Sequence, residues 1–550
     1  MTGYICKYAP VELMAGFGID AESMSPDEDN LDLSQGYIYP GICCFAKSIL
    51  QHALKIPYES ILFTDCCDAV KRIADVLIQQ SNQKIYMVSL PRFTDRKGRK
   101  RYANILECFI NQLEVEFGRG FDTNHFLAAC MRSSEKKDDE ILSDYIAVLG
   151  ARVPPSLFDE CQNLCKIPVR DLTCSSRKRF FENSPADQDR SVLMEWYADS
   201  LLMQTPCLRM ADTTARKSIL SDSHLKGLIY HTVKFCDFYN FEYAAMEKHV
   251  PILKLETDYT SDSTGQLQTR LEAFFEMKGV LKITSQPKIH NYSKVKYYAG
   301  IDIGSTSTDA VILDGNRRLL ANAVIPTGAK SLDAANRALK IVLKQAGLNQ
   351  DDISRMVTTG YGRNSVDFEC DNITEITCHA KGVNHWFPQA RSIIDIGGQD
   401  SKMIRLSDDG SVIDFAMNDK CAAGTGRFLE LIASTLNISL EQMSEYGLQW
   451  NKEIKISNMC AVFAESEIIS LIAQNEEICD IVHGVNLSIA VRIAGLAARI
   501  HAAGPFVMSG GVAKNRGVQL ALEQILNQPV QVVDHPQICG ALGAALLAIH

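Results

Sequence analysis

The chain contains two copies of one strand–turn–strand pattern, and this repeat constrains the fold more than any other feature of the sequence. The segment IDIGSTSTDAVIL begins at Ile301, and IDIGGQDSKMIRL begins at Ile394, 93 residues later. In each copy an apolar strand that contains an aspartate leads into a glycine turn with hydroxyl or amide side chains, and a second strand follows. Such a duplication predicts two similar lobes that face each other across a cleft.

The 550 residues are too many for one hydrophobic core, so several domains are expected. Residues 1–285 alternate strand-like apolar runs with helix-length segments, which predicts an open α/β region of two Rossmann-like subdomains, about 1–143 and 144–285. Residues 286–296 have weak periodicity and are interpreted as a linker. Residues 297–550 contain the repeat and are expected to form the two-lobed domain. The predicted fold class is therefore α/β in both parts.

Each copy of the repeat has the composition of an anion-binding turn. Gly304 permits a tight bend in which successive backbone N–H groups point at one anion, and the hydroxyls beside it add donors. Aspartates at the strand ends could hold a hydrated Mg²⁺ next to phosphates. The candidate residues are Asp302, Gly304, Ser305, Thr306, Ser307 and Thr308 in the first copy and Asp395, Gly397, Gly398 and Gln399 in the second.

Two cysteines directly precede segments with helical character. Cys421 begins CAAGTGRFLE, and Cys460 begins CAVFAESE 39 positions later. The positive end of a helix dipole lowers the pKa of a thiol and favours an anionic ligand. A [4Fe–4S] cluster takes four thiolates, so two cysteines from each chain of a twofold dimer would complete one cluster. The alternative interpretation is a pair of buried cysteines without a ligand.

The N-terminal half has further cysteines close to predicted strand ends and helix starts. In an open α/β sheet the loops at these positions converge on one site, which is the placement that a cluster needs. These cysteines are Cys43, Cys44, Cys66, Cys67, Cys207 and Cys236.

Composition excludes several classes of protein. The net charge of −10 argues against a general nucleic-acid binder. The N-terminus has neither a basic segment nor a sustained apolar one, so we expect no signal peptide, and the apolar run CGALGAALLAI is too short to span a membrane. We therefore expect a cytoplasmic protein. Its 18 cysteines favour metal or redox chemistry, because disulfides rarely persist in that compartment.

The C-terminal half resembles the acetate kinase, sugar kinase, heat-shock chaperone and actin superfamily of two-lobed ATPases. Its closer resemblance is to ATP-dependent activators of 2-hydroxyacyl-CoA dehydratases and to benzoyl-CoA reductase ATPase subunits. The motifs that carry it are YYAGIDIGSTST, TTGYGR, EITCHAKG, IIDIGGQDSK, NDKCAAGTGRFLE, MCAVFAESEIISL, MSGGVAKN and PQICGALGAA.

This resemblance implies ATP and Mg²⁺ between lobes whose angle changes on hydrolysis, and a homodimer bridged by one [4Fe–4S] cluster on Cys421 and Cys460 of each chain. Asp302 and Asp395 would then serve Mg²⁺ and the attacking water. Further nucleotide-binding residues would be Gly510 and Gly511, near the adenosine, together with Lys514 and Gln537.

The N-terminal half resembles iron–sulfur subunits of 2-hydroxyacyl-CoA dehydratases through APVELMAGFGI, GICCFAKSIL, DCCDAVKRIADVL, GARVPP, TPCLRM, VKFCDFY and LETDYTSDSTGQLQTRLEAFFE. The resemblance implies one [4Fe–4S] cluster on Cys43, Cys67 and Cys236. The doubled cysteines also resemble the double-cubane cluster proteins, in which Cys44, Cys66 and Cys207 would be possible further ligands.

The two resemblances together imply an ATP-driven enzyme. The C-terminal domain would pass low-potential electrons from a ferredoxin- or flavodoxin-like donor to the N-terminal cluster, for reduction of a small molecule or reductively initiated dehydration of a 2-hydroxyacyl-CoA. One alternative is a non-catalytic ATPase that matures or reactivates a separate iron–sulfur enzyme. A small-molecule kinase is a further alternative, but it leaves Cys421 and Cys460 without a role.

Overall fold

The computed structural model describes residues 1–26, 30–134, 143–174, 176–177, 179–181, 184–186, 188–246, 250–260, 264–282, 296–418, 422–456 and 461–549. The chain divides into two compact units, Met1–Leu271 and Glu272–His550. The division falls within helix α11 (Thr264–Met277). The predicted linker, residues 286–296, lies outside the described residues except for Lys296, and the predicted domain limits stay predictions.

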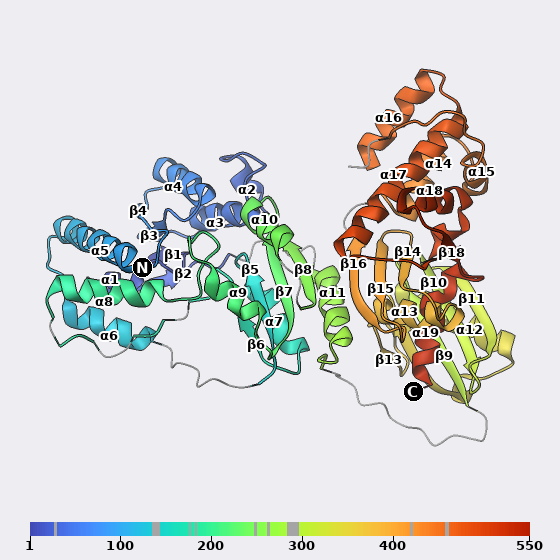
Figure 1. The fold of residues 1–550 in the computed structure, drawn as a ribbon, viewed down its shortest axis with the longest axis horizontal. Coiled ribbons are helices and arrows are strands. Elements are labelled where there is room, and N and C mark those ends of the chain that lie inside the picture. Colours follow the sequence, from blue (N-terminus) through green and yellow to red (C-terminus); the bar gives the residue numbers. More distant parts are fainter. Residues whose placement is uncertain are drawn as a thin grey trace. The chain divides into compact units, whose positions relative to one another are not determined.

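Unit 1 contains two four-stranded sheets, and every strand pair in them is parallel. The first sheet has the order β2-β1-β3-β4, and the second has the order β6-β5-β7-β8. Both sheets therefore repeat one topology, in which the first and third strands in chain order are neighbours (Figure 1). The strands are β1 (Thr2–Tyr4), β2 (Ala21–Ser23), β3 (Ser60–Thr64), β4 (Lys84–Val88), β5 (Tyr145–Gly150), β6 (Val169–Asp171), β7 (Leu225–Val233) and β8 (Ile252–Thr257).

Helices connect the parallel strands, as a crossover requires. They are α1 (Val11–Ala15), α2 (Asp32–Gln35), α3 (Cys44–Lys55), α4 (Asp68–Gln80), α5 (Arg96–Phe117), α6 (Thr123–Ser133), α7 (Pro155–Leu164), α8 (Arg190–Leu202), α9 (Thr214–Leu220), α10 (Asp237–Ala245) and α11. Helix α8 follows β6 in sequence but packs against α5 of the first sheet, where Tyr197 and Leu201 share a core with Phe109 and Ile110.

Unit 2 contains two five-stranded sheets with one shared topology, β11-β10-β9-β12-β13 and β16-β15-β14-β17-β18. In each sheet an antiparallel three-stranded meander continues into two parallel strands. The strands are β9 (Tyr297–Ile303), β10 (Ser307–Asp314), β11 (Leu319–Pro326), β12 (Ile353–Thr359), β13 (Asp371–Asn372), β14 (Ser392–Ile396), β15 (Ser401–Leu406), β16 (Val412–Asn418), β17 (Phe506–Ser509) and β18 (Val530–Val532). The repeat in the sequence forms β9–β10 and β14–β15, one hairpin in each lobe.

The helices of unit 2 are α12 (Ser331–Ala346), α13 (Glu375–Trp386), α14 (Gly426–Thr435), α15 (Leu440–Tyr446), α16 (Ala461–Ala473), α17 (Ile478–Arg499), α18 (Arg516–Leu526) and α19 (Cys539–Ala548), with short 3₁₀ helices η2 (Gln350–Asp352), η3 (Gly511–Lys514) and η4 (Pro536–Ile538). Helices α13 and α19 cross closely because Gly382 and Gly543 face each other's helix, where a Cβ atom would collide with a backbone carbonyl.

Helix α17 is long and apolar enough to cross a membrane by length and composition alone, but 67% of its apolar window is buried inside the unit. Ile481, Val485 and Ile489 on this helix belong to the core of the second lobe. We therefore interpret α17 as the core helix of that lobe. The predicted α/β class is confirmed for both parts: open α/β in the N-terminal unit, and two lobes of matching topology in the C-terminal unit.

Candidate functional site

The two repeated hairpins of unit 2 place two similar turns on one cavity of about 470 Å³. In the β9–β10 turn the N–H of Gly304 donates to the carbonyl of Ser307 at 2.9 Å, and in the β14–β15 turn the N–H of Gly397 donates to the carbonyl of Asp400 at 3.0 Å. Similar local sequences thus give similar turns, one from each lobe. Backbone N–H and hydroxyl groups of such turns make the cavity suited to an anion such as a phosphate chain.

His379 of α13 lies between the aspartates of the two lobes. Its Nε2 is 3.5 Å from Oδ2 of Asp302, and its Nδ1 is 3.4 Å from Oδ1 of Asp395. Burial lowers the pKa of His379, but the charges of Asp395 and Asp302 raise it overall to about 9. The imidazole is therefore protonated at neutral pH and holds a positive charge between two carboxylates.

Lys402 of β15 supplies the second buried cation. Its Nζ lies 2.9 Å from Asp400, 3.2 Å from Asp395 and 3.4 Å from Glu375. Burial raises the pKa of Glu375 to about 7, and the same burial would raise that of Asp395, but the charges of His379 and Lys402 lower it overall. Asp395 therefore remains ionised, as a metal-binding carboxylate must be.

Three buried oxygens in this cavity lack a hydrogen-bond partner within the described chain: Oγ1 of Thr306, Oδ1 of Asp309 and Oε1 of Glu375. Buried polar atoms normally have partners, so these oxygens point to a ligand. Hard oxygen donors around a phosphate-sized cavity fit Mg²⁺ and a nucleotide. The residues present are therefore compatible with the expected Mg·ATP.

Glycines after β17 also shape the cavity. Gly510 follows β17 with a φ of 85°, and a Cβ atom there would collide with the carbonyl of Ile396. Lys514 of η3 donates to the side chain of Gln537. The other residues lining this part of the cavity are Leu429, Glu430, Leu440, Glu441, Ser444, Gly511, Val512 and Asn515. Apolar and polar groups therefore both line this part of the cavity.

The structure brings most of the predicted nucleotide residues to this cavity. Those that line it are Asp302, Gly304, Ser305, Thr306, Ser307, Asp395, Gly397, Gly398, Gly510, Gly511, Lys514 and Gln537. Thr308 and Gln399 are not among the lining residues. Thr308 is fully buried and shares a hydrogen bond of 2.9 Å with Thr327, and Gln399 is exposed at the tip of its turn.

Sequence reasoning missed one tyrosine and five titratable residues that also line the cavity, which are Tyr361, Asp309, Glu375, His379, Asp400 and Lys402. One signal was available, because Glu375 and His379 are four positions apart and so share a helix face. Nothing in the local sequence showed that this face meets the aspartates of both lobes.

The second turn is bonded directly to helix α14. The N–H of Gly426 donates to the carbonyl of Gly397, and the N–H of Arg427 donates to that of Gly398, both at 2.8 Å. Cys421 and Cys460, the predicted ligands of the bridging cluster, lie outside the described residues. Helix α14 begins five residues after Cys421, and α16 begins directly after Cys460. The second turn of the cleft is thus bonded to the start of α14, which follows Cys421 in the sequence.

Unit 1 contains a cavity of about 420 Å³ lined by seven cysteines, Cys6, Cys43, Cys66, Cys67, Cys174, Cys207 and Cys236. Cys6 follows β1, Cys66 and Cys67 follow β3, Cys174 follows β6, and Cys236 follows β7. In parallel α/β sheets ligands bind outside the carboxyl ends of the strands, where neighbouring loops diverge. The shared strand order of the two sheets explains why thiols far apart in sequence meet at one cavity.

The thiols form two hydrogen-bonded groups. A hydrogen bond from Cys43 lowers the pKa of Cys236 to about 6, and the same contact raises that of Cys43 well above its usual value. A hydrogen bond with Cys66 lowers the pKa of Cys6 and raises that of Cys66. Thiols close enough to share protons are close enough to bind a common inorganic group.

The predicted ligands are mostly at this cavity. Cys43, Cys67 and Cys236 line it, as do Cys66 and Cys207. Cys44 does not: its side chain lies in a hydrophobic core beside Leu31, and burial raises the pKa of its thiol.

Cys6 and Cys174 were not predicted. Each follows a short strand as a single cysteine, without the doubled pattern of Cys43-Cys44 and Cys66-Cys67 and outside the motifs that identified Cys207 and Cys236.

The donor set fits an iron–sulfur cluster better than a single ion. Among the described residues, no three His, Cys, Asp or Glu side chains converge on one metal position. A cubane needs no such convergence because each thiolate binds a different iron, and thiolates are the ligands that iron–sulfur clusters use. Seven thiols exceed the four ligands of one cubane.

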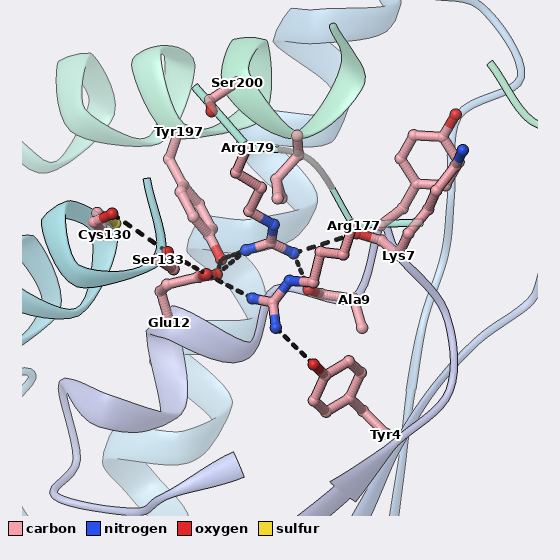
Figure 2. A network of polar contacts seen from close by, with 12 residues as sticks. Tyr4, Lys7, Ala9, Glu12, Cys130, Ser133, Arg177, Arg179, Tyr197 and Ser200 are labelled. Carbon is pink, nitrogen blue, oxygen red and sulfur yellow. Dashed lines mark hydrogen bonds and ion pairs between the residues drawn. The ribbon is translucent and has the colours of Figure 1, made fainter. Parts of the chain in front are cut away.

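A buried ion network supports the loop that carries Cys6. Figure 2 shows Glu12 of α1 facing Arg177, Arg179 and Tyr197. Arg179, which is fully buried, also donates to the carbonyl oxygens of Lys7 and Ala9 at 3.2 and 2.7 Å. These bonds fix the backbone immediately after Cys6, so its thiol is held at the cavity without a cluster.

The cleft between matching lobes, with an anion-binding turn and an aspartate from each, defines a two-lobed, actin-like nucleotide-binding protein. Residues 299–548 match the BadF/BadG/BcrA/BcrD ATPase family, and residues 6–141 and 141–278 match the D-component of 2-hydroxyglutaryl-CoA dehydratase. The chain belongs to the BadF/BadG/BcrA/BcrD ATPase family and joins to it a region of the dehydratase D-component family. Both predicted resemblances are confirmed.

Known relatives match the C-terminal half. The activator of lactoyl-CoA dehydratase from Anaerotignum propionicum is 48% identical over 46% of this chain and 97% of its own length. The (R)-2-hydroxyglutaryl-CoA dehydratase activating ATPase from Acidaminococcus fermentans is 41% identical over 46% and 96%. A solved structure of the activator of the 2-hydroxyisocaproyl-CoA dehydratase from Clostridium difficile with bound ADPNP is 42% identical, covers 46% of this chain and 94% of its own, and has a TM-score of 0.45.

Proposed function

We propose that the protein is a self-contained ATP-driven reductase, in which unit 2 hydrolyses ATP and delivers low-potential electrons to a cluster in unit 1. The observation that carries the proposal is the cavity of unit 1, where seven cysteines from separate loops meet in a chain that also has a nucleotide cleft. The names of three relatives state activation of a dehydratase, and one of these relatives is named an activating ATPase. The fused D-component region makes the electron acceptor part of the same chain.

Asp302 and Asp395 would hold Mg²⁺ and the attacking water in this proposal. His379 and Lys402 keep the surrounding carboxylates compensated when the metal is absent. His379 contacts an aspartate from each lobe, so a change in the distance between the lobes would change at least one of these two contacts. Binding of Mg·ATP would change the charge at both aspartates and so change the preferred lobe angle.

The bonds from Gly426 and Arg427 to the second turn offer a route from the nucleotide to Cys421. A turn that moves with the phosphates must move the N-terminus of α14, or break both bonds. The bridging [4Fe–4S] cluster, held by Cys421 and Cys460 of two chains, would supply one-electron transfer at low potential. For one electron about 59 mV corresponds to about 1.4 kcal/mol, so a modest conformational change shifts the driving force substantially.

Helix α16 supports a homodimer. It begins directly after Cys460, and Phe463, Ile469 and Ile472 on it are 67%, 54% and 41% exposed. Apolar side chains gathered next to a cluster ligand are typical of a surface that a partner covers. A second copy would cover this face and bring the two remaining thiolates.

The cluster of unit 1 would be held by Cys43, Cys67 and Cys236 with Cys6, Cys66, Cys174 and Cys207 as further ligands. Seven thiols favour a double cubane and hence reduction of a small molecule. Dehydration of a 2-hydroxyacyl-CoA at a single cubane is the second candidate, favoured by the D-component match. A ferredoxin- or flavodoxin-like protein would donate the electrons in the cytoplasm, and neither nucleic acid nor membrane takes part.

Iron and acid-labile sulfide per dimer test the proposal on anaerobically purified protein. The bridging cluster alone predicts about 4 iron atoms, one further cubane per chain about 12, and a double cubane per chain about 20. A value near 20 supports the small-molecule reductase, and a value near 12 supports the dehydratase. A value near 4 would leave unit 1 as the docking module of a reactivating ATPase, and zero would favour a kinase.

A further inference from the structure

One buried cation, Lys7, and one half-buried cation, Arg209, line the cysteine cavity of unit 1, and neither forms an ion pair with a described carboxylate. Lys7 is 3% exposed, and its Nζ donates only to the carbonyl oxygens of Thr205 and Thr173, at 2.6 and 3.4 Å. Arg209 lies over the ring of Phe238, 4.3 Å from its centroid, and its buried Nε has no hydrogen-bond partner. Among the residues that the structure places, no acidic side chain forms an ion pair with either cation.

Both cations face thiols. Burial lowers the pKa of Arg209, but the thiols of Cys67, Cys207 and Cys66 raise it overall. Burial lowers the pKa of Lys7, and the neighbouring thiols of Cys207, Cys174 and Cys6 oppose that shift in part. Cys207 is common to both sets, so the two cations share one thiol and together face five of the seven.

The other two cations of the cavity have different surroundings. Arg152 donates to the carbonyl oxygens of Ile5 and Met24 and thereby ties loops together. Arg72 forms a 2.8 Å ion pair with Asp75 and is 63% exposed. Arg152 also acts on Cys174, but its guanidinium is held by several backbone and hydroxyl oxygens. Lys7 and Arg209 have no acidic partner among the described side chains, and they have fewer oxygen partners than Arg152.

A buried, uncompensated charge costs several kcal/mol, so it persists where an anion is bound. The anion here must lie among the thiols, because the cations point there. Cation charge and hydrogen bonds to sulfur stabilise the reduced, more negative form of an iron–sulfur group. The arrangement thus has a direct consequence for electron transfer.

We propose that Arg209, together with Lys7, is a positioning residue that raises the reduction potential of the cluster on the unit 1 thiols, so that unit 2 can reduce it. The inference rests on the proposed function, since it requires a cluster at these thiols. Arg209 is the first residue to test. It lies against Phe238, whose side chain is half exposed and also lines the cavity. Its guanidinium brings charge and donors to the sulfur atoms without binding iron.

The test is a redox titration followed by electron paramagnetic resonance on the full-length chain. Every sample carries Cys421→Ser, so that the signal comes from the N-terminal thiols alone. We expect Arg209→Gln to lower the midpoint potential by at least about 59 mV, a tenfold change in the one-electron equilibrium constant. Arg209→Lys keeps the charge and should recover most of the difference, and Lys7→Met should shift the potential in the same direction.

Arg72→Gln is the matched control, because Arg72 lines the same cavity but is already paired with Asp75. It should leave the midpoint potential unchanged. If Arg209→Gln and Lys7→Met keep full iron and titrate with the wild-type potential, the inference is wrong while the proposed function stands. If the wild-type protein holds no iron at the N-terminal thiols, the proposed function fails and the inference fails with it.

Discussion

The cavity of unit 1 and the cleft of unit 2 have opposite charge arrangements. In the cleft, buried carboxylates surround the cations Lys402 and His379. In the cysteine cavity, Lys7 and Arg209 have no carboxylate partner among the described residues and face thiols instead. Each unit is built from two copies of one topology, so fold duplication does not explain the difference. The difference comes from the side chains at the strand ends.

This difference indicates what each site binds. Hard carboxylate and hydroxyl oxygens suit Mg²⁺ and phosphates, and soft thiolates suit iron–sulfur groups. In the cleft of unit 2 the carboxylates of Asp302, Asp395, Asp400 and Glu375 outnumber the cations His379 and Lys402, which leaves negative charge for a metal ion that accompanies a nucleotide. The cavity of unit 1 leaves two cations uncompensated, which suits a ligand that stays bound. The residual charge thus favours a cation in the cleft of unit 2 and an anion in the cavity of unit 1.

The largest expected effect comes from removing the buried cation Lys402 from the carboxylates of unit 2. Lys402→Met leaves Glu375, Asp395 and Asp400 buried without their cation. Removing one partner of a buried ion pair destabilises by about 3–5 kcal/mol. We expect a loss of this size in the unfolding free energy of unit 2, measured by denaturant-dependent hydrogen exchange of β15.

Lys452→Met provides the control, because the ion pair of Lys452 with Glu476 is exposed. Exposed pairs contribute about 0–1 kcal/mol. An equal loss of stability in Lys402→Met and Lys452→Met would show that the buried carboxylates of the cleft do not depend on Lys402 for their stability.

The second prediction concerns acid stability in unit 1. His231 of β7 is fully buried, with its ring nitrogens 3.1 Å from the carbonyl of Ala151 and 2.9 Å from the hydroxyl of Thr257. Burial lowers its pKa to about 4. The unfolded chain binds this proton near pH 6.5 and the folded chain does not, so stability is lost as the pH falls from about 6.5 to 4, by about 3 kcal/mol in all.

Hydrogen exchange of β7 peptides between pH 4 and 7, corrected for intrinsic exchange, measures this loss. His231→Gln removes the titrating group and should flatten this part of the pH dependence. His379 in unit 2 is protonated throughout this range, since its pKa is raised to about 9. A flatter pH dependence in His231→Gln but not in His379→Gln would sharpen the contrast between these two buried histidines, and an unchanged slope in His231→Gln would remove it.

The sequence was sufficient for the parts of each site that depend on local pattern. The repeated aspartate–glycine turns are visible as two similar segments, and the structure places them on one cavity. Cys43, Cys67 and Cys236 were identified from family motifs. In these cases the residues that act together either repeat a short pattern or belong to a motif that a known family shares.

The remaining residues depend on tertiary structure. Cys6 and Cys174 reach the cavity because parallel pairing sets their strand ends beside the others, and neither position has a local signature. Lys402 and His379 interact only because β15 and α13 meet at the cleft. Long-range pairing of this kind leaves no mark in a single sequence, so such residues could not be assigned beforehand.

The smallest expected effect compares two helix caps. The thiol of Cys67, a candidate ligand, caps α4 by accepting from the N–H of Val70 at 3.4 Å, whereas Ser439 caps α15 by accepting from the N–H of Gln442 at 3.2 Å. A hydroxyl cap contributes about 1 kcal/mol, so Ser439→Ala should speed hydrogen exchange of α15 about fivefold. Ser439→Asp retains an acceptor and should exchange like the wild type.

Helix α15 has only seven residues and carries Leu440, Glu441 and Ser444 to the nucleotide cavity, so its order depends on the cap more than a longer helix would. Saturating ATP should then slow exchange of α15 in both Ser439→Ala and the wild type, because a ligand that contacts the helix stabilises its folded form.

Cys67→Ser makes the matching change in unit 1, where the hydroxyl preserves the cap of α4 but not the soft ligand. Unchanged α4 exchange with reduced iron content would separate the structural role of this thiol from its role as a ligand. Faster exchange with full iron content would show that Cys67 is only a cap, and the contrast between the two units would then rest on the other six thiols.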